Sequence, residues 1–137
     1  MAQVITDATG AQAHLGYVAE VEGGAVRVVL DVAPHHTNRN GHLHGGLMAV
    51  LLDSAMGYTA SLHDDADVLR PTVTVSMTVN YLAPGRGGRV VATAQVTGGG
   101  RRLKFVDGVL RDADGVTLAT ASGVFKMLDG HGPGGDA

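Results

Sequence analysis

The segment Gly45–Leu62 constrains the fold more than any other part of this sequence, because its apolar residues are not confined to one helical stripe. They cover most of a helical wheel: Leu47, Met48, Val50, Leu51, Leu52, Ala55, Met56 and Ala60. A helix that is apolar nearly all round is buried on most of its sides. The sequence therefore predicts a long central helix enclosed by other elements, with Asp53 as its only formal charge.

The rest of the chain has the patterns of strands. Two apolar-rich runs between residues 14 and 32 flank Gly23 and Gly24, a pair typical of a hairpin turn. A polar loop over residues 33–44 then leads into the helix. Beyond the helix, apolar and polar side chains alternate from Val73 to Tyr81, as in a half-buried strand. Short turns separate three further expected strands, over residues 90–97, 103–111 and 117–128, and imply antiparallel neighbours.

This order predicts an α+β fold in which an antiparallel sheet of about six strands wraps around the central helix. One sheet covers only one side of a helix, so we expect a partner subunit to complete its burial. A chain of 137 residues is long enough for one hydrophobic core. We expect residues 1–128 to form a single domain and residues 129–137 to be a disordered tail.

Composition excludes several classes of protein. Ten basic against 13 acidic residues give a net charge of −3, and so no general attraction to nucleic acid or to an anionic membrane. The chain has no cysteine, which excludes disulfides and thiolate nucleophiles. Its first residues lack a signal-peptide pattern, and no apolar run approaches the ~20 residues of a membrane helix. We predict a cytoplasmic protein with no nucleic-acid or membrane partner.

Gly45 and Gly46 stand where the polar loop enters the helix. A helix N-terminus has unpaired N–H groups and a partial positive charge, and glycine lets a ligand oxygen approach them closely. Such donors stabilise the negative charge that develops when a carbonyl is attacked. The pair is therefore either an oxyanion and substrate-binding site or a device of loop geometry alone.

Asp53 is the second candidate site residue. A carboxylate on a buried apolar helix costs on the order of several kcal/mol unless it is paired or hydrogen-bonded. It is either a structural group that caps neighbouring backbone or a general base or nucleophile. Asp53 lies seven residues beyond Gly46, ~10 Å along the helix axis, which is too far for both to act on one carbonyl within one chain. We expect two antiparallel helices of an isologous dimer to form each site together.

The spacing of these residues is that of a known family. Asn38 is followed by Gly41, by the His-Gly-Gly triplet 44–46 and by Asp53, and the strands after the helix extend the match over about residues 14–128. In this pattern the chain resembles the PaaI-type (phenylacetic-acid degradation) thioesterases of the hotdog superfamily.

The resemblance implies an acyl-CoA thioesterase that forms a homodimer, often assembled into a homotetramer, with sites at the subunit interface. Gly45 N–H would polarise the thioester carbonyl, and Asp53 of the partner subunit would act as general base or nucleophile. His44 and Asn38 would position the carbonyl or the water, and the Thr74 hydroxyl would hold the water. Such enzymes need no metal or organic cofactor.

The remaining titratable residues carry weaker signals. His35, His36 and His42 lie in the loop without a carboxylate at fitting spacing, so we expect no metal site. Basic residues of the second half are typical of solvated turns: Arg86, Arg89, Arg101, Arg102 and Lys104. Among them Arg101 and Arg102, which follow three glycines, are the best candidates to bind the phosphates of CoA.

Two other functions remain open. A non-catalytic acyl-CoA-binding hotdog module would share the fold, but it would need neither the glycine pair nor the buried carboxylate. A hotdog dehydratase or hydratase usually pairs a histidine with an acidic residue in a motif different from this one. The acyl group cannot be read from the sequence.

Overall fold

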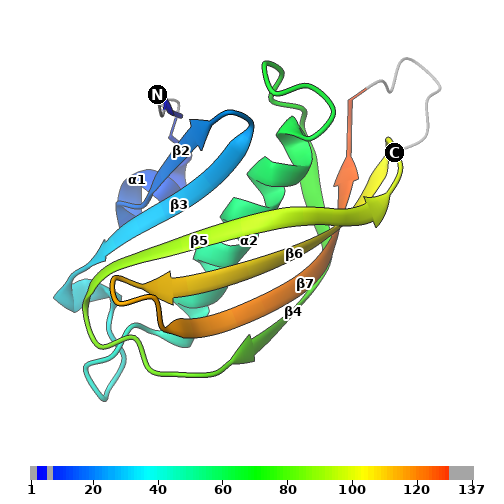
Figure 1. Ribbon diagram of the computed structural model, residues 1–137. Coiled ribbons are helices and arrows are strands. Elements are labelled where there is room, and N and C mark those ends of the chain that lie inside the picture. The colour runs from blue at the N-terminus through cyan, green and yellow to red at the C-terminus, as the bar shows by residue number, and fades with distance from the viewer. Residues whose placement is uncertain (1–2, 6–7, 130–137) are drawn as a thin grey trace.

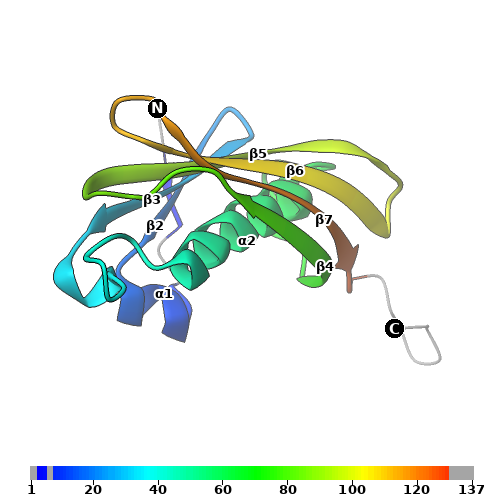
Figure 2. The same cartoon turned by 90° about the horizontal axis from the view of Figure 1, so that it is seen from below.

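The computed structural model describes residues 3–5 and 8–129 as one antiparallel sheet that curves over one long helix (Figure 1). The elements in chain order are β1 (Gln3–Val4), α1 (Gly10–Leu15), β2 (Val18–Glu22), β3 (Ala25–Val32), a 3-10 turn (Pro34–His36), α2 (Gly45–Leu62), β4 (Thr72–Tyr81), β5 (Gly88–Gly99), β6 (Leu103–Asp112) and β7 (Thr117–Met127). The strand order in the sheet is β1-β2-β3-β5-β6-β7-β4. Seen from below, α2 lies under the curved sheet (Figure 2).

This arrangement confirms the predicted α+β hotdog fold, with seven strands rather than about six. The additional strand, β1, has two residues and pairs with β2 at one edge of the sheet. The central helix spans the predicted segment. The first apolar run instead begins in α1, which ends at Gly16 in a left-handed conformation (φ 84°). Thr9 caps this six-residue helix, and only its last two residues, His14 and Leu15, fall in the run that was expected to be extended.

The hairpin of β2 and β3 turns at the two predicted glycines. Gly23 and Gly24 have φ values of 58° and 82°. A two-residue hairpin loop with positive φ at both positions matches the right-handed twist of its strands, and glycine adopts it without steric cost.

The core lies between α2 and the sheet. Gly108 on β6 sits directly under the helix, since a Cβ there would lie 2.9 Å from Cγ of Met56. Glycine at this position therefore allows the helix to approach the sheet closely. The largest fully buried side chains are Phe125, Leu43, Leu51, Leu52, Met56, Leu110, Leu118 and Met127.

A β-bulge divides β4 into two parts. Thr74 pairs with Phe125 and Ser76 with Val124, which leaves Val75 as an extra residue in the strand. The alternation predicted one apolar face from residue 73 to 81, and this prediction is wrong. Val73 and Val75 are 43% and 58% exposed, whereas Met77 and Val79 beyond the bulge pack against the core. The extra residue shifts the alternation by one position.

The edge of the sheet at β4 has only β7 as a neighbour. Several large apolar side chains are exposed on this strand and on β6 beyond β7: Val73, Val75, Tyr81, Leu103 and Phe105. No helix formed by the described residues combines the length and the apolarity needed to cross a membrane. Of the predicted tail, Asp129 is described and pairs with Arg70, while residues 130–137 lie outside the described residues.

Candidate active site

Hydrogen bonds among its own polar groups shape the loop over residues 33–44 that precedes α2. Oδ1 of Asn38 accepts from the backbone N–H groups of Asn40 (2.9 Å) and His42 (3.1 Å). Asn38 and Gly45 line the same pocket, which has a volume of about 400 Å³. The structure thus brings these two predicted site residues together, and it assigns the Asn38 side-chain oxygen to the loop.

The start of α2 has one backbone donor satisfied and one open. Nδ1 of His44, the N-cap residue, accepts from Gly46 N–H at 2.9 Å. The His44 carbonyl accepts from the N–H groups of Leu47 (2.9 Å) and Met48 (3.1 Å). Among the described residues, no acceptor takes the N–H of Gly45. The helix N-terminus therefore offers Gly45 N–H to a ligand, with the favourable field of the helix dipole behind it.

Tyr81 completes this pocket, and sequence reasoning missed it. Its hydroxyl donates to the Gly45 carbonyl at 3.0 Å, and a Cβ on Gly45 would lie 3.3 Å from Cε1 of its ring. In a strand with regular alternation, Tyr81 would lie on the same face as Val73, which is exposed before the bulge. The sequence carries no signal for the bulge, and so none for this contact.

Asp53 and Thr74 meet across the gap between α2 and β4. The Thr74 hydroxyl donates to Oδ1 of Asp53 at 2.6 Å. Within the described chain no backbone N–H donates to this carboxylate, so its contacts are not those of a structural cap. The two residues border a pocket of about 380 Å³, whose walls include Tyr17, Gly57, Tyr58, Leu69 and Phe125. One carboxylate oxygen is held by the hydroxyl, and the other is available to a water or a substrate carbon.

The two pockets are separate within one chain. They share no lining residue, and Gly45 and Asp53 are eight residues apart, about 12 Å along the helix axis. Strand β4 contributes to both, because Thr74 reaches one and Tyr81 the other. Each pocket therefore holds one of the two candidate groups: a backbone donor in one and a carboxylate in the other.

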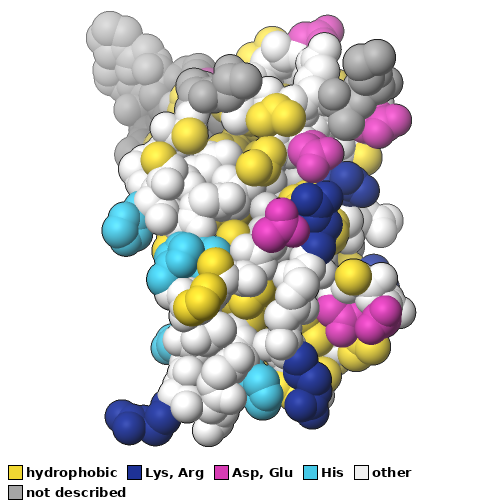
Figure 3. Space-filling model, turned by 90° about the vertical axis from the view of Figure 1, so that its left-hand side faces the viewer, with side chains coloured by type: hydrophobic (Ala, Val, Ile, Leu, Met, Phe, Trp, Pro, Cys, Tyr) yellow, Lys and Arg dark blue, Asp and Glu magenta, His cyan; other side chains and the backbone are white. Residues whose placement is uncertain are grey.

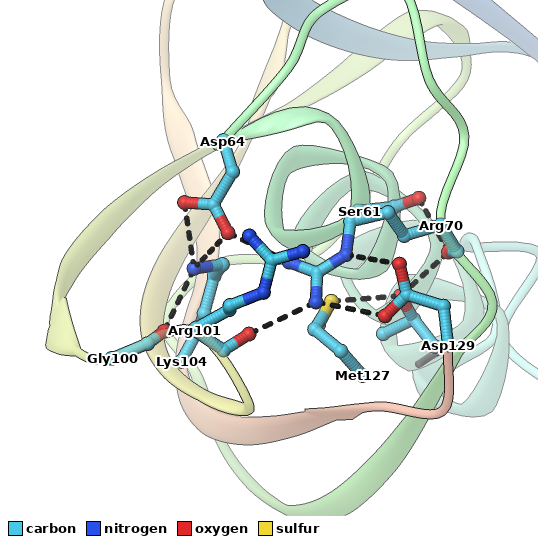
Figure 4. A network of polar contacts seen from close by, with 9 residues as sticks. Ser61, Asp64, Arg70, Gly100, Arg101, Lys104, Met127 and Asp129 are labelled. Carbon is cyan, nitrogen blue, oxygen red and sulfur yellow. Dashed lines mark hydrogen bonds and ion pairs between the residues drawn. The ribbon is translucent and has the colours of Figure 1, made fainter. Parts of the chain in front are cut away.

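A buried cluster of charges lies at the carboxyl end of α2 (Figure 4). Arg70, 6% exposed, donates to both oxygens of Asp129 (2.6 and 2.8 Å) and to Asp64 (2.6 Å). Lys104, 2% exposed, donates to Asp64 (3.1 Å) and to the Gly100 carbonyl (2.8 Å). The interpretation of Lys104 as a solvated turn charge was wrong, because β6 directs it under the helix end towards Asp64.

Hydrogen bonds keep both carboxylates of this cluster ionised. The bond from Lys104 holds the pKa of Asp64 below its ordinary value, against the effect of burial and together with the charges of Lys104 and Arg70. The bond from Arg70 lowers the pKa of Asp129 in the same way. Because these pKa values are lowered on folding, the carboxylates stabilise the fold above the unfolded-state pKa of about 3.9. That contribution is lost as the pH falls through the folded-state values.

The other basic residues differ in their surroundings. Arg89 pairs with Asp31 on the surface, where both side chains are more than half exposed. Arg101 and Arg102 are exposed in the turn between β5 and β6, and the Arg101 carbonyl accepts from Arg70 at 3.2 Å. Since Arg70 also lines the Asp53 pocket, this turn lies at the same end of the molecule as Asp53.

The loop histidines have structural contacts. His36 is 3% exposed; its Nδ1 accepts from Ala33 N–H (2.8 Å) and its Nε2 donates to the Leu15 carbonyl (2.7 Å). Histidine side chains lie among hydrophobic and charged ones on the face in Figure 3. Over residues 3–5 and 8–129 no three histidine or acidic side chains are grouped so as to hold a metal ion.

Comparison with known proteins places this geometry in a family. The human protein named acyl-coenzyme A thioesterase 13 is 33% identical over 106 residues, which are 75% of this chain and 74% of the relative. A Bacillus halodurans protein whose structure contains CoA is 29% identical with a TM-score of 0.76, over 88% of this chain and 77% of that one. The E. coli PaaI protein is 24% identical with a TM-score of 0.77 over 89% and 86%, a likeness of fold.

Residues 40–119, more than half of the chain, match the family described as the thioesterase superfamily. This segment contains the glycine pair, Asp53, Thr74 and Tyr81. The PaaI type in particular is not distinguished by these matches. The predicted thioester hydrolase is confirmed at the level of the family, and the chain belongs to the thioesterase superfamily.

Proposed function

We propose that this protein hydrolyses an acyl-CoA thioester to the free acid and CoA. The observation that carries the proposal is the pair of half-sites: an open Gly45 N–H at a helix N-terminus and an Asp53 carboxylate held by Thr74. The names of the human relative and of the CoA-containing neighbour support the choice of acyl-CoA as the substrate class.

In this reaction Gly45 N–H donates to the thioester oxygen and stabilises the negative charge that develops there. Asp53 either takes a proton from the attacking water or itself attacks the carbonyl carbon, with water then hydrolysing the mixed anhydride. Thr74 holds Oδ1, so Oδ2 faces the reaction. The carbon–sulfur bond breaks in either course. When Asp53 acts as general base, the leaving thiolate takes back the proton that Asp53 removed from water. When Asp53 attacks, the thiolate takes a proton from solvent, and water then cleaves the anhydride to the acid and the Asp53 carboxylate, with release of a proton to solvent. His44 and Asn38 act from the loop by shaping the Gly45 donor. Gly46 donates its N–H to His44 and borders a neighbouring pocket with that residue.

We further propose that each site combines Gly45 of one subunit with Asp53 of the partner subunit. The separation of the two pockets along α2 supports this arrangement, as does the β4 edge with its exposed apolar side chains. An unpaired strand edge is a template for pairing with a second chain. The homodimer, its assembly into a homotetramer, the PaaI-type affiliation and the cytoplasmic location remain proposals made from the sequence.

Arg101 and Arg102 are proposed to bind the phosphates of CoA. Both are exposed near the end of α2 that carries the Asp53 pocket, and guanidinium groups pair with phosphates in a bidentate manner.

The test is a panel of acyl-CoA esters, from short and medium chains to aryl-acyl groups, with thiol release as the readout. Asp53→Asn should lower kcat by about a thousandfold or more for the preferred ester, while circular dichroism remains unchanged. Asp107→Asn is a matched control, since Asp107 also accepts from a hydroxyl, that of Ser122 at 2.8 Å, but on the exposed surface. Binding of acyl-CoA without thiol release would instead identify a non-catalytic binding module.

A further inference from the structure

We propose that Tyr81 is a positioning residue of the thioester site, which locks the peptide unit between Gly45 and Gly46 and so fixes the direction of Gly45 N–H. The inference builds on the proposed function, because it concerns the donor that would bind the thioester oxygen. Tyr81 approaches this donor from the end of β4, on the opposite side of the Gly45 pocket from the loop that precedes the helix.

Two successive peptide units form the start of α2, and they are held differently. In the first, between His44 and Gly45, the carbonyl accepts from the first helical turn and the N–H is open. In the second, between Gly45 and Gly46, the N–H donates to His44 Nδ1 at 2.9 Å and the carbonyl accepts from Tyr81 at 3.0 Å. The second unit is thus held at both ends by side chains, one from each side of the helix start.

This lock matters because two adjacent glycines are the most freely rotating pair of residues in a chain. Rotation of the Gly45–Gly46 peptide would break the bonds to His44 and Tyr81 and unwind the first helical residue, whose N–H is the open donor. A donor stabilises a developing oxyanion best when it needs no reorganisation during the reaction. The Tyr81 ring also closes the space beside Gly45, where a Cβ would lie 3.3 Å away from Cε1.

The surroundings of Tyr81 argue against a role in stability alone. Within one subunit it is 54% exposed, so its removal uncovers little additional apolar surface of that subunit. It lies on the helix side of β4 only because the bulge at Val75 shifts the alternation of the strand. Gly123 on β7 accommodates this bulge, since a Cβ there would lie 2.8 Å from the Ser76 carbonyl.

The experiment compares Tyr81→Phe, which keeps the ring and removes the hydroxyl, with the unmodified chain. We expect kcat for the preferred acyl-CoA to fall about fivefold, the rate equivalent of one net hydrogen bond. KM and the melting temperature should stay close to their original values. Hydrogen exchange measured by NMR should show a faster Gly46 amide in the variant, which a merely structural role would not predict. Thr97→Val is the matched control, because the Thr97 hydroxyl also donates to a backbone carbonyl, that of Phe105, away from both pockets.

The outcomes separate this inference from the proposed function. If the unmodified chain releases thiol and Tyr81→Phe keeps its full kcat, the inference is overturned and the proposed function stands. If the unmodified chain releases no thiol from any ester, the proposed function fails. The hydrogen-exchange rate of the Gly46 amide then decides whether Tyr81 holds the Gly45–Gly46 peptide unit in place. Faster exchange in Tyr81→Phe then supports the lock, and unchanged exchange overturns it.

Discussion

Polar groups lie at both ends of α2, but those at the amino end include an open hydrogen-bond donor, whereas those at the carboxyl end are paired charges. At the amino end the contacts are made by backbone groups and uncharged side chains, and Gly45 N–H is left open among the described residues. At the carboxyl end two buried cations, Arg70 and Lys104, are paired with carboxylates. An open donor can act on a ligand, whereas a paired buried charge can only hold the fold together.

The two ends also differ in how much stability is lost when a polar group has no partner. An open N–H at a helix start is reached by water when no ligand is bound, so the amino end loses little stability by it. A buried cation without its carboxylate would lose several kcal/mol, on the order of what a broken buried ion pair costs. Substitutions at the amino end should therefore change the rate of the reaction, and substitutions at the carboxyl end the stability.

Of the substitutions that compare the two ends of α2, Gly45→Pro should have the largest effect, and it tests the amino end. Proline removes the N–H and is tolerated at the first position of a helix, and His44 before it is already extended (ψ 133°). We expect kcat to fall about 10²–10³-fold, as for the loss of one oxyanion donor, with a small change in melting temperature. Gly10→Pro is the matched control, since it removes the first N–H of α1 instead. A Gly45→Pro chain with unimpaired turnover would show that the open N–H is not the donor.

Asp64→Asn should test the carboxyl end. It removes the carboxylate that faces Lys104, 2% exposed, and leaves the Gly100 carbonyl as the acceptor of its hydrogen bond at 2.8 Å. We expect the free energy of unfolding in urea to fall by about 3 kcal/mol, the low end for a broken buried ion pair. Asp31→Asn, which breaks the exposed pair with Arg89, should leave it nearly unchanged, because solvent screens an exposed ion pair. Equal effects of the two substitutions would remove the distinction between the buried cluster and surface pairs.

Arg102→Ala should have the smallest effect. It compares an exposed arginine with the buried Arg70 at the same end of α2. Arg102 is exposed, unlike Arg70, so we expect stability to be nearly unchanged. KM for acyl-CoA should rise about threefold to tenfold, as for the loss of one net hydrogen bond to phosphate at an exposed site, and KM for a pantetheine-like thioester should not. Arg111→Ala, on the exposed surface at the other end of β6, serves as the control. Equal KM changes for both esters would argue against a phosphate contact.

The sequence predicted those features that depend on residues near one another in the chain. The apolar segment with its glycine pair predicted α2, and Gly23 and Gly24 predicted the hairpin. The spacing of Gly45 and Asp53 along the helix predicted two half-sites that do not meet in one chain. The family resemblance singled out Thr74 as a residue that would hold the water, whereas the strand pattern did not, and the hydrogen bond between Thr74 and Asp53 was not predicted.

The features that the sequence did not predict depend on contacts between residues that lie far apart in the chain. Arg70 lies six residues from Asp64 but 59 from Asp129, and neither spacing has a periodic signature. In β4 the alternation of apolar residues continues through the bulge, so the sequence looks like one regular strand. Only the register against β7 reveals the extra residue, and with it the side of the sheet on which Tyr81 lies.

The central claim is that one active site needs Gly45 of one subunit and Asp53 of its partner. Chains carrying Asp53→Asn and chains carrying Gly45→Pro, each nearly inactive alone, should be unfolded together and refolded as mixed dimers. Random pairing makes half of the dimers mixed, and one of their two sites is intact, so we predict recovery of about a quarter of the original thiol release. Activity no higher than the sum of the separate variants, in a sample shown to contain mixed dimers, would contradict the claim.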